Sequence, residues 1–542
     1  MRWHRTKVLA ADFVTSKDAE EIAIEVERFV TQNLEQGDHK KAMKKLKVVP
    51  VGQETASSWE IFRIGLLFGY TCLLIVVTLL VMSWANCTAG VKGCWRTNIE
   101  INNENETITQ LETSDIFYTI SIRLFRPSFL VALKVLLFGV CIMLWGSVGI
   151  NHALFFDSDL REANSAAKMV EVGLAMASLT GTSLLIWIFQ FYIAHVTGIS
   201  VSVIQYISLS HLAIFIVFFF NPFPCLLSNA RFWLLKALAR VFTAPFQPVR
   251  FSDLFIAEQL TSLLPLFRSP VFIVCCSVVN FEAKKSQTYC NEQLAPFYTI
   301  LAATPYWIRF AQCLRKFHDR KKSKKRCHKA MLNALKYLIA MMFVATLSLS
   351  ELRPKNSLFY DRVFEAVSML LAFAAFLFWF LWDICVDWKL FKNDKLDLML
   401  DSSSRLFRNN LTFRKTWFYY TVICVDFVLL ALFWTAQVLS RRYQSYRFEF
   451  FMTFVTIGEV VRRFLWNLIR LESENVFNPA KLPVTTNVIV QNCSLLKPHI
   501  NKEFERVDRM MTEEDGVNKA RRERRASSIH KFKEIHKCHT AV

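Results

Sequence analysis

Long uncharged segments separated by charged loops dominate the chain. Residues 64–84 contain no charged side chain, and no Asp, Glu, Lys or Arg occurs from Val172 to Ala230. A bilayer core of about 30 Å needs about 20 mainly apolar residues per helix, so these stretches predict one and two membrane spans. The same reading gives ten candidate spans, at 64–84, 127–150, 170–194, 199–220, 254–281, 296–314, 331–350, 360–383, 416–440 and 448–469. The predicted fold class is therefore all-α, in a polytopic membrane protein.

Composition narrows the class further. The 542 residues are 53% hydrophobic, with only 14 Gly and 14 Pro, which excludes collagen-like and Pro/Gly-rich disordered chains. The formal net charge is +20. Much of that excess lies in short basic stretches such as 315–329 and in the C-terminal tail, without interleaved aromatic residues or a known nucleic-acid module, so no nucleic-acid partner is predicted.

Loop charges predict the orientation. Residues 85–115 are mainly acidic and carry N-x-T sequons at Asn86 and Asn105, which predicts a glycosylated extracytosolic loop. Residues 315–329 hold nine Lys/Arg against one Asp, which predicts a cytosolic loop. With ten spans both termini are then cytosolic. The basic segment 441–447 falls on the opposite side and disagrees with this scheme.

Cysteine usage and missing motifs exclude several chemistries. The 14 cysteines contain no C-x-x-C pair and no Cys/His zinc spacing, so no metal or other cofactor is predicted. Cys87 and Cys94 share the predicted outer loop and could pair, although spacing alone does not prove it; Cys290 also lies in a predicted outer loop, at 281–295. No nucleotide-binding or hydrolase motif occurs, so we predict no enzyme activity, and transport would be downhill or ion-coupled.

Charged residues recur within the last six predicted spans. A charge at mid-bilayer is costly and is retained where it faces protein or water. The residues are Glu258, Arg268, Arg309, Lys336, Asp383, Asp426, Glu459, Arg462 and Arg463. For single members an alternative stays open: Lys134 or Arg309 could snorkel toward a membrane surface, and Asp383 and Asp426 could be structural partners of nearby cations.

The spacing of Glu459, Arg462 and Arg463 places all three side chains on one helix face, where the carboxylate partly neutralises the two guanidiniums. Arg forks suit tetrahedral oxyanions, and Lys336 would add a point charge. We therefore expect a water-lined path in spans 5–10 with more cations than anions, selective for a small anion.

Five segments of the chain carry a family resemblance. They are SNARFWLLKALARVFTAPFQPVRFSDLFIAEQLTSL (228–263), PYWIRFAQCLRKFHD (305–319), NALKY (333–337), LWDICVDWKLF (381–391) and GEVVRRFLWNLIRLESEN (458–475). These segments closely resemble the EXS domain. The chain is similar to the family of the xenotropic and polytropic retrovirus receptor and the plant root-to-shoot phosphate exporters, over about residues 15–478.

The resemblance implies export of inorganic phosphate from the cytosol through spans 5–10 of a homodimer in the plasma membrane, with an internal membrane such as the Golgi as the alternative. It also implies regulation by inositol pyrophosphates bound to an N-terminal SPX domain. The implied substrate-binding residues are Glu258, Thr261, Arg309, Lys336, Tyr337, Asp383, Arg462 and Arg463, with Trp434 as the gate and Glu459 beside it.

The chain departs from the family pattern in three places. Only a remnant of the SPX domain precedes the membrane, in residues 1–59, which weakens the case for inositol pyrophosphate regulation. Ala431 stands where the family has an Arg. Glu258, Thr261 and Leu264 replace the usual Asp, Asn and Ser. These differences support a second hypothesis, a transport-deficient paralogue that acts as a receptor or regulatory membrane protein.

The expected organisation has four parts. An SPX remnant and linker (1–59) precede transmembrane helices 1–4 (60–225), and the EXS domain with helices 5–10 (226–478) precedes a disordered cytosolic tail (479–542).

Overall fold

The protein is described by a computed structural model. It describes residues 28, 32, 57–88, 104–150, 152–156, 166–223, 227–281, 289–290, 293–322, 328–351, 358–391, 407–408, 411–413, 415–440 and 446–477; the side chains of 82–88, 104–116 and a few other positions are not described. Apart from residues 28, 32 and 57–59, the SPX remnant lies outside these residues, as do the C-terminal tail and the Cys87–Cys94 pairing. So do the side chains of the two glycosylation sequons.

Helices form nearly all of the described chain, and its described residues contain one isolated β-bridge, between Phe391 and Phe407. The first half holds α4 (Ser58–Thr88), α5 (Glu104–Ser147), α6 (His152–Phe155), α7 (Ala166–Ile188), α8 (Gln190–Thr197), α9 (Val201–Gln205) and α10 (Ile207–Phe220). The second half holds α11 (Ser228–Phe242), α12 (Phe251–Thr261), α13 (Leu264–Val278), α15 (Ala295–Lys322), α16 (His328–Glu351), α17 (Leu358–Trp382), the π-helix η3 (Asp383–Asp387), α19 (Thr416–Leu439) and α20 (Tyr446–Phe477).

The helices confirm an all-α polytopic membrane fold. Within the described residues, seven are long and apolar enough to cross a bilayer, and an eighth span results if the bent pair α12 and α13 is counted as one. α15 and α20, of 28 and 32 residues, are long enough but fall short in apolar character, because each carries buried charges. Each of the ten predicted spans coincides with one of these helices or helix pairs.

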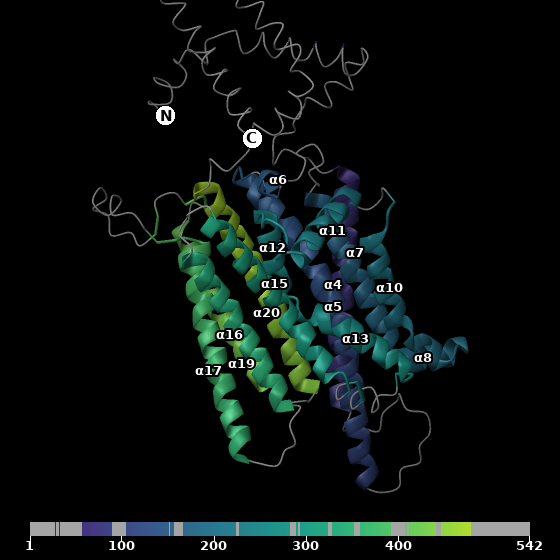
Figure 1. The fold of residues 1–542 in the computed structure, drawn as a ribbon. Helices are drawn as coiled ribbons and strands as arrows, with labels where there is room; N and C mark the ends of the chain where they lie inside the picture. The colour runs from purple at the N-terminus through teal and green to yellow at the C-terminus, as the bar shows by residue number, and fades with distance from the viewer. Residues whose placement is uncertain are drawn as a thin grey trace, which may run out of the picture. The chain divides into compact units, whose positions relative to one another are not determined.

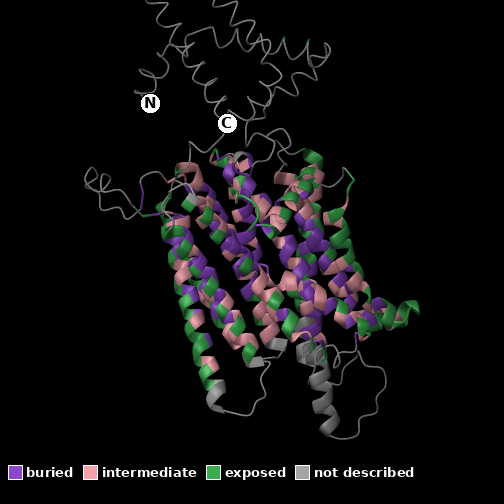
Figure 2. Cartoon of the chain, in the orientation of Figure 1, coloured by how far each residue is buried: buried purple, intermediate pink, exposed green. Residues whose placement is uncertain are grey.

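The helix bundle brings distant segments together (Figure 1). α4 packs on α7, α7 on α5, and α5 on α20; α15, α16, α17, α19 and α20 then pack in succession. Large apolar side chains such as Leu66 and Phe68 of α4 are more than half exposed, and Figure 2 shows such exposed positions along the outer faces of the bundle. This pattern is typical of helices that face lipid.

Close helix approach explains the tight α5–α7 contact. A Cβ atom on Gly173 would lie 2.6 Å from the backbone nitrogen of Leu136, and one on Gly139 would lie 2.9 Å from that of Val170. Only glycine fits at these positions, so two small residues fix the distance between the helices.

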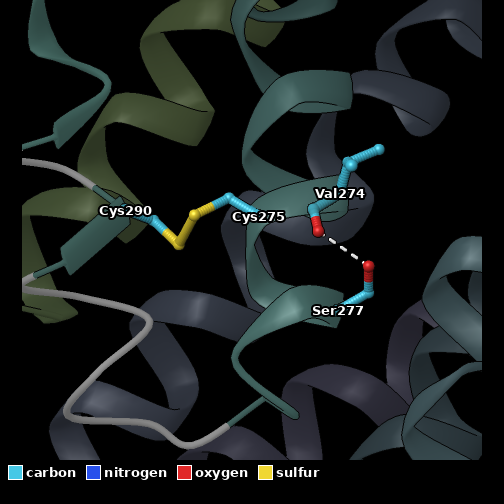
Figure 3. The surroundings of a disulfide bond; sticks show 4 residues. All are labelled: Val274, Cys275, Ser277 and Cys290. Carbon is cyan, nitrogen blue, oxygen red and sulfur yellow. Dashed lines mark hydrogen bonds between the residues drawn. A yellow bond between two sulfur atoms is a disulfide. The ribbon is translucent and has the colours of Figure 1, made fainter.

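α13 is covalently tied to the segment that precedes α15. Cys275 and Cys290 form a disulfide, and one turn of α13 beside it carries a hydrogen bond from Ser277 Oγ to the Val274 carbonyl oxygen at 2.7 Å (Figure 3). The sequence placed Cys290 in an outer loop, but it did not indicate this pairing.

Arg408 and Thr412 are fastened to α20 by a buried carboxylate. Glu472 is 0% exposed and accepts hydrogen bonds from Arg408 Nη2, Tyr419 OH and the Thr412 N–H, each at 2.9 Å. Arg408 also donates to the Trp388 carbonyl oxygen at 3.2 Å. This cluster joins the residues after η3 to the end of α20.

Candidate functional site

Arg462 lies at the centre of a buried group of carboxylates. Its Nε and Nη2 donate to Glu459, one turn earlier on α20, at 2.7 and 2.9 Å. Its Nη1 donates to Asp383 of η3 and to Asp426 of α19, both at 2.9 Å. One guanidinium therefore links three elements that are far apart in sequence.

Glu258 of α12 forms a second centre. Its Oε1 accepts from Arg309 Nη2 of α15 at 2.9 Å and from the hydroxyl of Tyr337 of α16. Lys336 Nζ lies 3.8 Å from the same oxygen, and Arg463 Nη2 lies 3.3 Å from Oε2. Four groups from three other helices thus converge on one carboxylate.

Hydroxyl groups at a helix break join the two centres. α12 ends at Thr261 and α13 begins at Leu264, with a bend of 59° between their axes. Ser262 Oγ in this break donates to Glu459 at 2.7 Å and accepts from Arg463 Nε at 2.9 Å; Thr261 Oγ1 accepts from Arg463 Nη2 at 3.2 Å. The charged side chains therefore form one ion network.

The ion network is electrically balanced. We define it by four cations and four carboxylates, each at most 4% exposed: Arg309, Lys336, Arg462, Arg463, Glu258, Asp383, Asp426 and Glu459. The sequence indicated more cations than anions, whereas these eight side chains sum to zero. Buried charges are retained when paired and hydrogen-bonded, because their separate desolvation would cost several kcal/mol each.

The four cations are held to different degrees. Arg462 is enclosed by three carboxylates, whereas Lys336 Nζ has no hydrogen-bond partner among the described residues. It lies instead over the rings of Tyr337, Trp379 and Trp382, at 4.7, 4.9 and 5.5 Å from their centroids. Such cation–π contacts are worth about 0.5–2 kcal/mol, which is less than an ion pair with a buried carboxylate.

Trp434, the expected gate, is separated from the ion network by the ring of Trp379. Its ring is 5.5 Å from that of Trp379 and 5.3 Å from that of Phe343, and Trp379 in turn lies 5.5 Å from Tyr337. The indole N–H of Trp434 is buried without a hydrogen-bond partner among the described residues. Its gating role stays a prediction.

The structure gathers the nine other expected site residues in the ion network or at its edge, in hydrogen-bond or ion-pair contact with a member. The expected shared face of Glu459, Arg462 and Arg463 is confirmed by their contacts. Neither Lys134 nor Arg309 snorkels, because each donates a hydrogen bond within the bundle. Arg268 lies outside the ion network, 5.0 Å from the ring of Tyr298.

Comparison with known proteins identifies the family. The EXS family model matches residues 121–476, about two thirds of the chain. The chain belongs to the EXS family. A xenotropic and polytropic retrovirus receptor 1 homolog of Xenopus laevis is 28% identical over 526 residues, which cover 95% of this chain and 68% of that protein. Solute carrier family 53 member 1 of Homo sapiens is 27% identical over 535 residues, covering 96% and 70%.

The EXS match begins within α5, so it includes helices that the expected boundary at residue 226 leaves out. In this EXS chain the ion network contains Asp426, which the sequence indicated only as a possible structural partner. Beside the network, Gln312 accepts from Arg309 Nη1 at 2.6 Å and donates to the Asp253 carbonyl oxygen at 3.2 Å. The i, i+3 spacing of Arg309 and Gln312 was the available signal.

Ala431 lies beside an aromatic cluster of this EXS chain. It is partly buried and packs against the cluster that contains Tyr337, Trp379 and Trp434. A longer basic side chain at this position would start beside Trp434. Among the described residues no group of three His, Cys, Asp or Glu side chains could hold a metal ion.

Proposed function

We propose that the chain exports inorganic phosphate, downhill from the cytosol, along α12, α15, α16, η3, α19 and α20. The observation that carries this proposal is a network of four buried cations beside the break between α12 and α13, with Arg463 hydrogen-bonded to Thr261 and Ser262 at the break itself. The family supports transport as the general role, since one relative is named as a solute carrier.

The break is chemically suited to an oxyanion. The N-terminus of α13 begins there, and helix N-termini at a broken membrane helix stabilise negative charge. Arg463 contributes a planar fork between two hydroxyls, and Lys336 contributes an ammonium with no hydrogen bond to the described residues. A phosphate could replace the long contacts of Glu258 to these two cations, at 3.3 and 3.8 Å.

The orientation of the path in the membrane has separate support. Structural disulfides form in oxidising compartments, so the Cys275–Cys290 bond favours an extracytosolic position for that end of α13. This agrees with the positive-inside prediction for residues 315–329, and it would orient the path from the basic cytosolic end to the disulfide-bearing end. Phosphate, the plasma membrane and a homodimer remain proposals.

Radiolabelled phosphate efflux from cells that express the full chain tests this function. Arg463→Gln should lower efflux per surface copy by about tenfold or more, because hydrogen bonds to a charged group contribute about 1.5–3 kcal/mol. Arg63→Gln is the matched control: Arg63 pairs with Glu171 of α7 at 2.7 Å, between helices of the first half. Equal efflux from both variants, or none from wild type, would refute the proposal.

A transport-deficient receptor or regulator is the second candidate. It is favoured by the balanced formal charges of the ion network and by Ala431, and the relatives of Xenopus laevis and Danio rerio are named as receptor homologs. Ala431→Arg separates the candidates. If this substitution creates efflux where wild type has none, the second candidate holds; robust wild-type efflux excludes it.

A further inference from the structure

Lys134 is a further cation inside the helix bundle, and the ion network does not include it. It lies on α5, in the first half of the chain, and is only partly exposed. Its Nζ donates to Gln259 Oε1 at 2.5 Å, and Gln259 Nε2 donates to Asn467 Oδ1 of α20 at 2.7 Å. A lysine from the first half therefore contacts α12, which carries Glu258, and is linked through Gln259 to α20, which carries Arg463.

The partners of Lys134 are neutral. No described carboxylate lies within 4.0 Å of its ammonium, and an amide oxygen can accept a hydrogen bond from the ammonium but cannot cancel its charge. The two amides belong to the same local structure as the ion network, because Gln259 follows Glu258 and Asn467 lies one turn after Arg463. Lys134 also interacts electrostatically with Arg463, Glu459 and Arg462.

The charge balance gives this lysine its significance. Because the formal charges of the eight members of the ion network sum to zero, the ammonium of Lys134 adds one positive charge that no described carboxylate within 4.0 Å offsets. Away from bulk water such an ammonium either loses its proton or gains a counter-ion, so a bound anion and the charged lysine stabilise each other. In a protein that carries anions, that counter-ion is the substrate.

We propose that Lys134 is a further specificity-determining residue, which makes the substrate-free site net positive and so selects a small oxyanion. This inference rests on the proposed function for its substrate class. Lys134 acts through its charge; the hydrogen bond to Gln259 only positions that charge.

Three variants of the full chain separate charge from hydrogen bonding. Lys134→Arg keeps the charge, whereas Lys134→Gln keeps a hydrogen-bond donor for Gln259 without the charge. Asn467→Asp keeps an acceptor for Gln259 and retains the lysine, but adds a carboxylate that cancels the excess charge. Each purified protein is heated in detergent with increasing phosphate or sulfate, and the anion concentration that gives half the maximal stabilisation is measured.

We expect Lys134→Arg to stay within about twofold of wild type, and both Lys134→Gln and Asn467→Asp to raise the half-effective concentration about tenfold, as for loss of one unit of nearby charge. Wild-type behaviour of Lys134→Gln, or equal losses in Lys134→Arg and Lys134→Gln, overturns the inference. So does a wild-type protein that neither anion stabilises. If Lys134→Gln does not fold, Asn467→Asp decides by the same criterion.

The same titration distinguishes this inference from the proposed function. If sulfate but not phosphate stabilises wild type, and the two charge-changing variants weaken the sulfate effect, Lys134 selects an anion and the phosphate proposal fails. If phosphate stabilises all four proteins equally, the phosphate proposal stands and the role of Lys134 is refuted.

Discussion

The same substitution should impair folding at Arg462 of α20 but transport at its neighbour Arg463. Arg462→Met removes the cation shared by Glu459, Asp383 and Asp426, and the only hydrogen bond of the Asp426 side chain to a described residue is lost with it. Arg463→Met leaves every carboxylate with a cation. We therefore expect Arg462→Met to impair folding and Arg463→Met to impair transport.

The contacts set the size of the difference. Removing one partner of a buried ion pair costs about 3–5 kcal/mol, and proton uptake by the carboxylates that lose their cation limits the loss for Arg462→Met to that range. After Arg463→Met, Glu258 keeps Arg309 and Lys336, and Glu459 keeps Arg462, so about 1–2 kcal/mol is lost. At about 2 °C per kcal/mol, the midpoints fall by about 6–10 °C and 2–4 °C.

Thermal unfolding in detergent, followed by size-exclusion chromatography of the fluorescently tagged chain, measures both midpoints. Phosphate efflux per surface copy is measured in the same cells. Arg463→Met should reach the surface normally and lose at least about tenfold in efflux, whereas Arg462→Met should be scarce. Equal midpoint losses, or a stable Arg462→Met protein, would show that the assignment of the contacts is wrong.

Three further substitutions test the scaffold. Gly173→Ala puts a Cβ 2.6 Å from the α5 backbone and should cost about 1–3 kcal/mol, whereas Gly65→Ala, with nothing within 4 Å, should leave the thermal midpoint unchanged. Cys275→Ser removes a disulfide that contributes about 2–4 kcal/mol, so its midpoint should fall and should no longer respond to a reducing agent. Glu472→Gln weakens the contact of residue 472 with Arg408 and should accelerate limited proteolysis near residues 407–413. An unchanged cleavage rate would show that this contact does not hold the segment.

The span pattern could be predicted because each span must meet the same length and polarity requirement. The break at Ser262 was not predicted, since Thr, Ser and Leu are compatible with a continuous helix. Pro265 at the start of α13 was its one local signal.

Pairing within the site could be predicted only where the sequence separation was a helical turn, as for Glu459 and Arg462. Asp426 and Lys134 remained ambiguous for the same reason: their partners lie on other helices, and helix neighbours in a bundle are set by packing that no local pattern records. The electrical balance of the ion network depends on those unpredicted pairings.

The anchoring of the two half-helices limits how the site can move. α13 is held at its far end by the disulfide and by aromatic packing around Phe272, while α12 is held through Asp253, which accepts from Arg240 Nε at 2.8 Å and through its carbonyl oxygen from Gln312 at 3.2 Å. Because both half-helices are anchored, the residues between them form the hinge. A tilt of either half-helix would first displace Ser262, whose hydroxyl contacts both Arg463 and Glu459. Opening of the break between α12 and α13 would therefore also separate these two charged side chains.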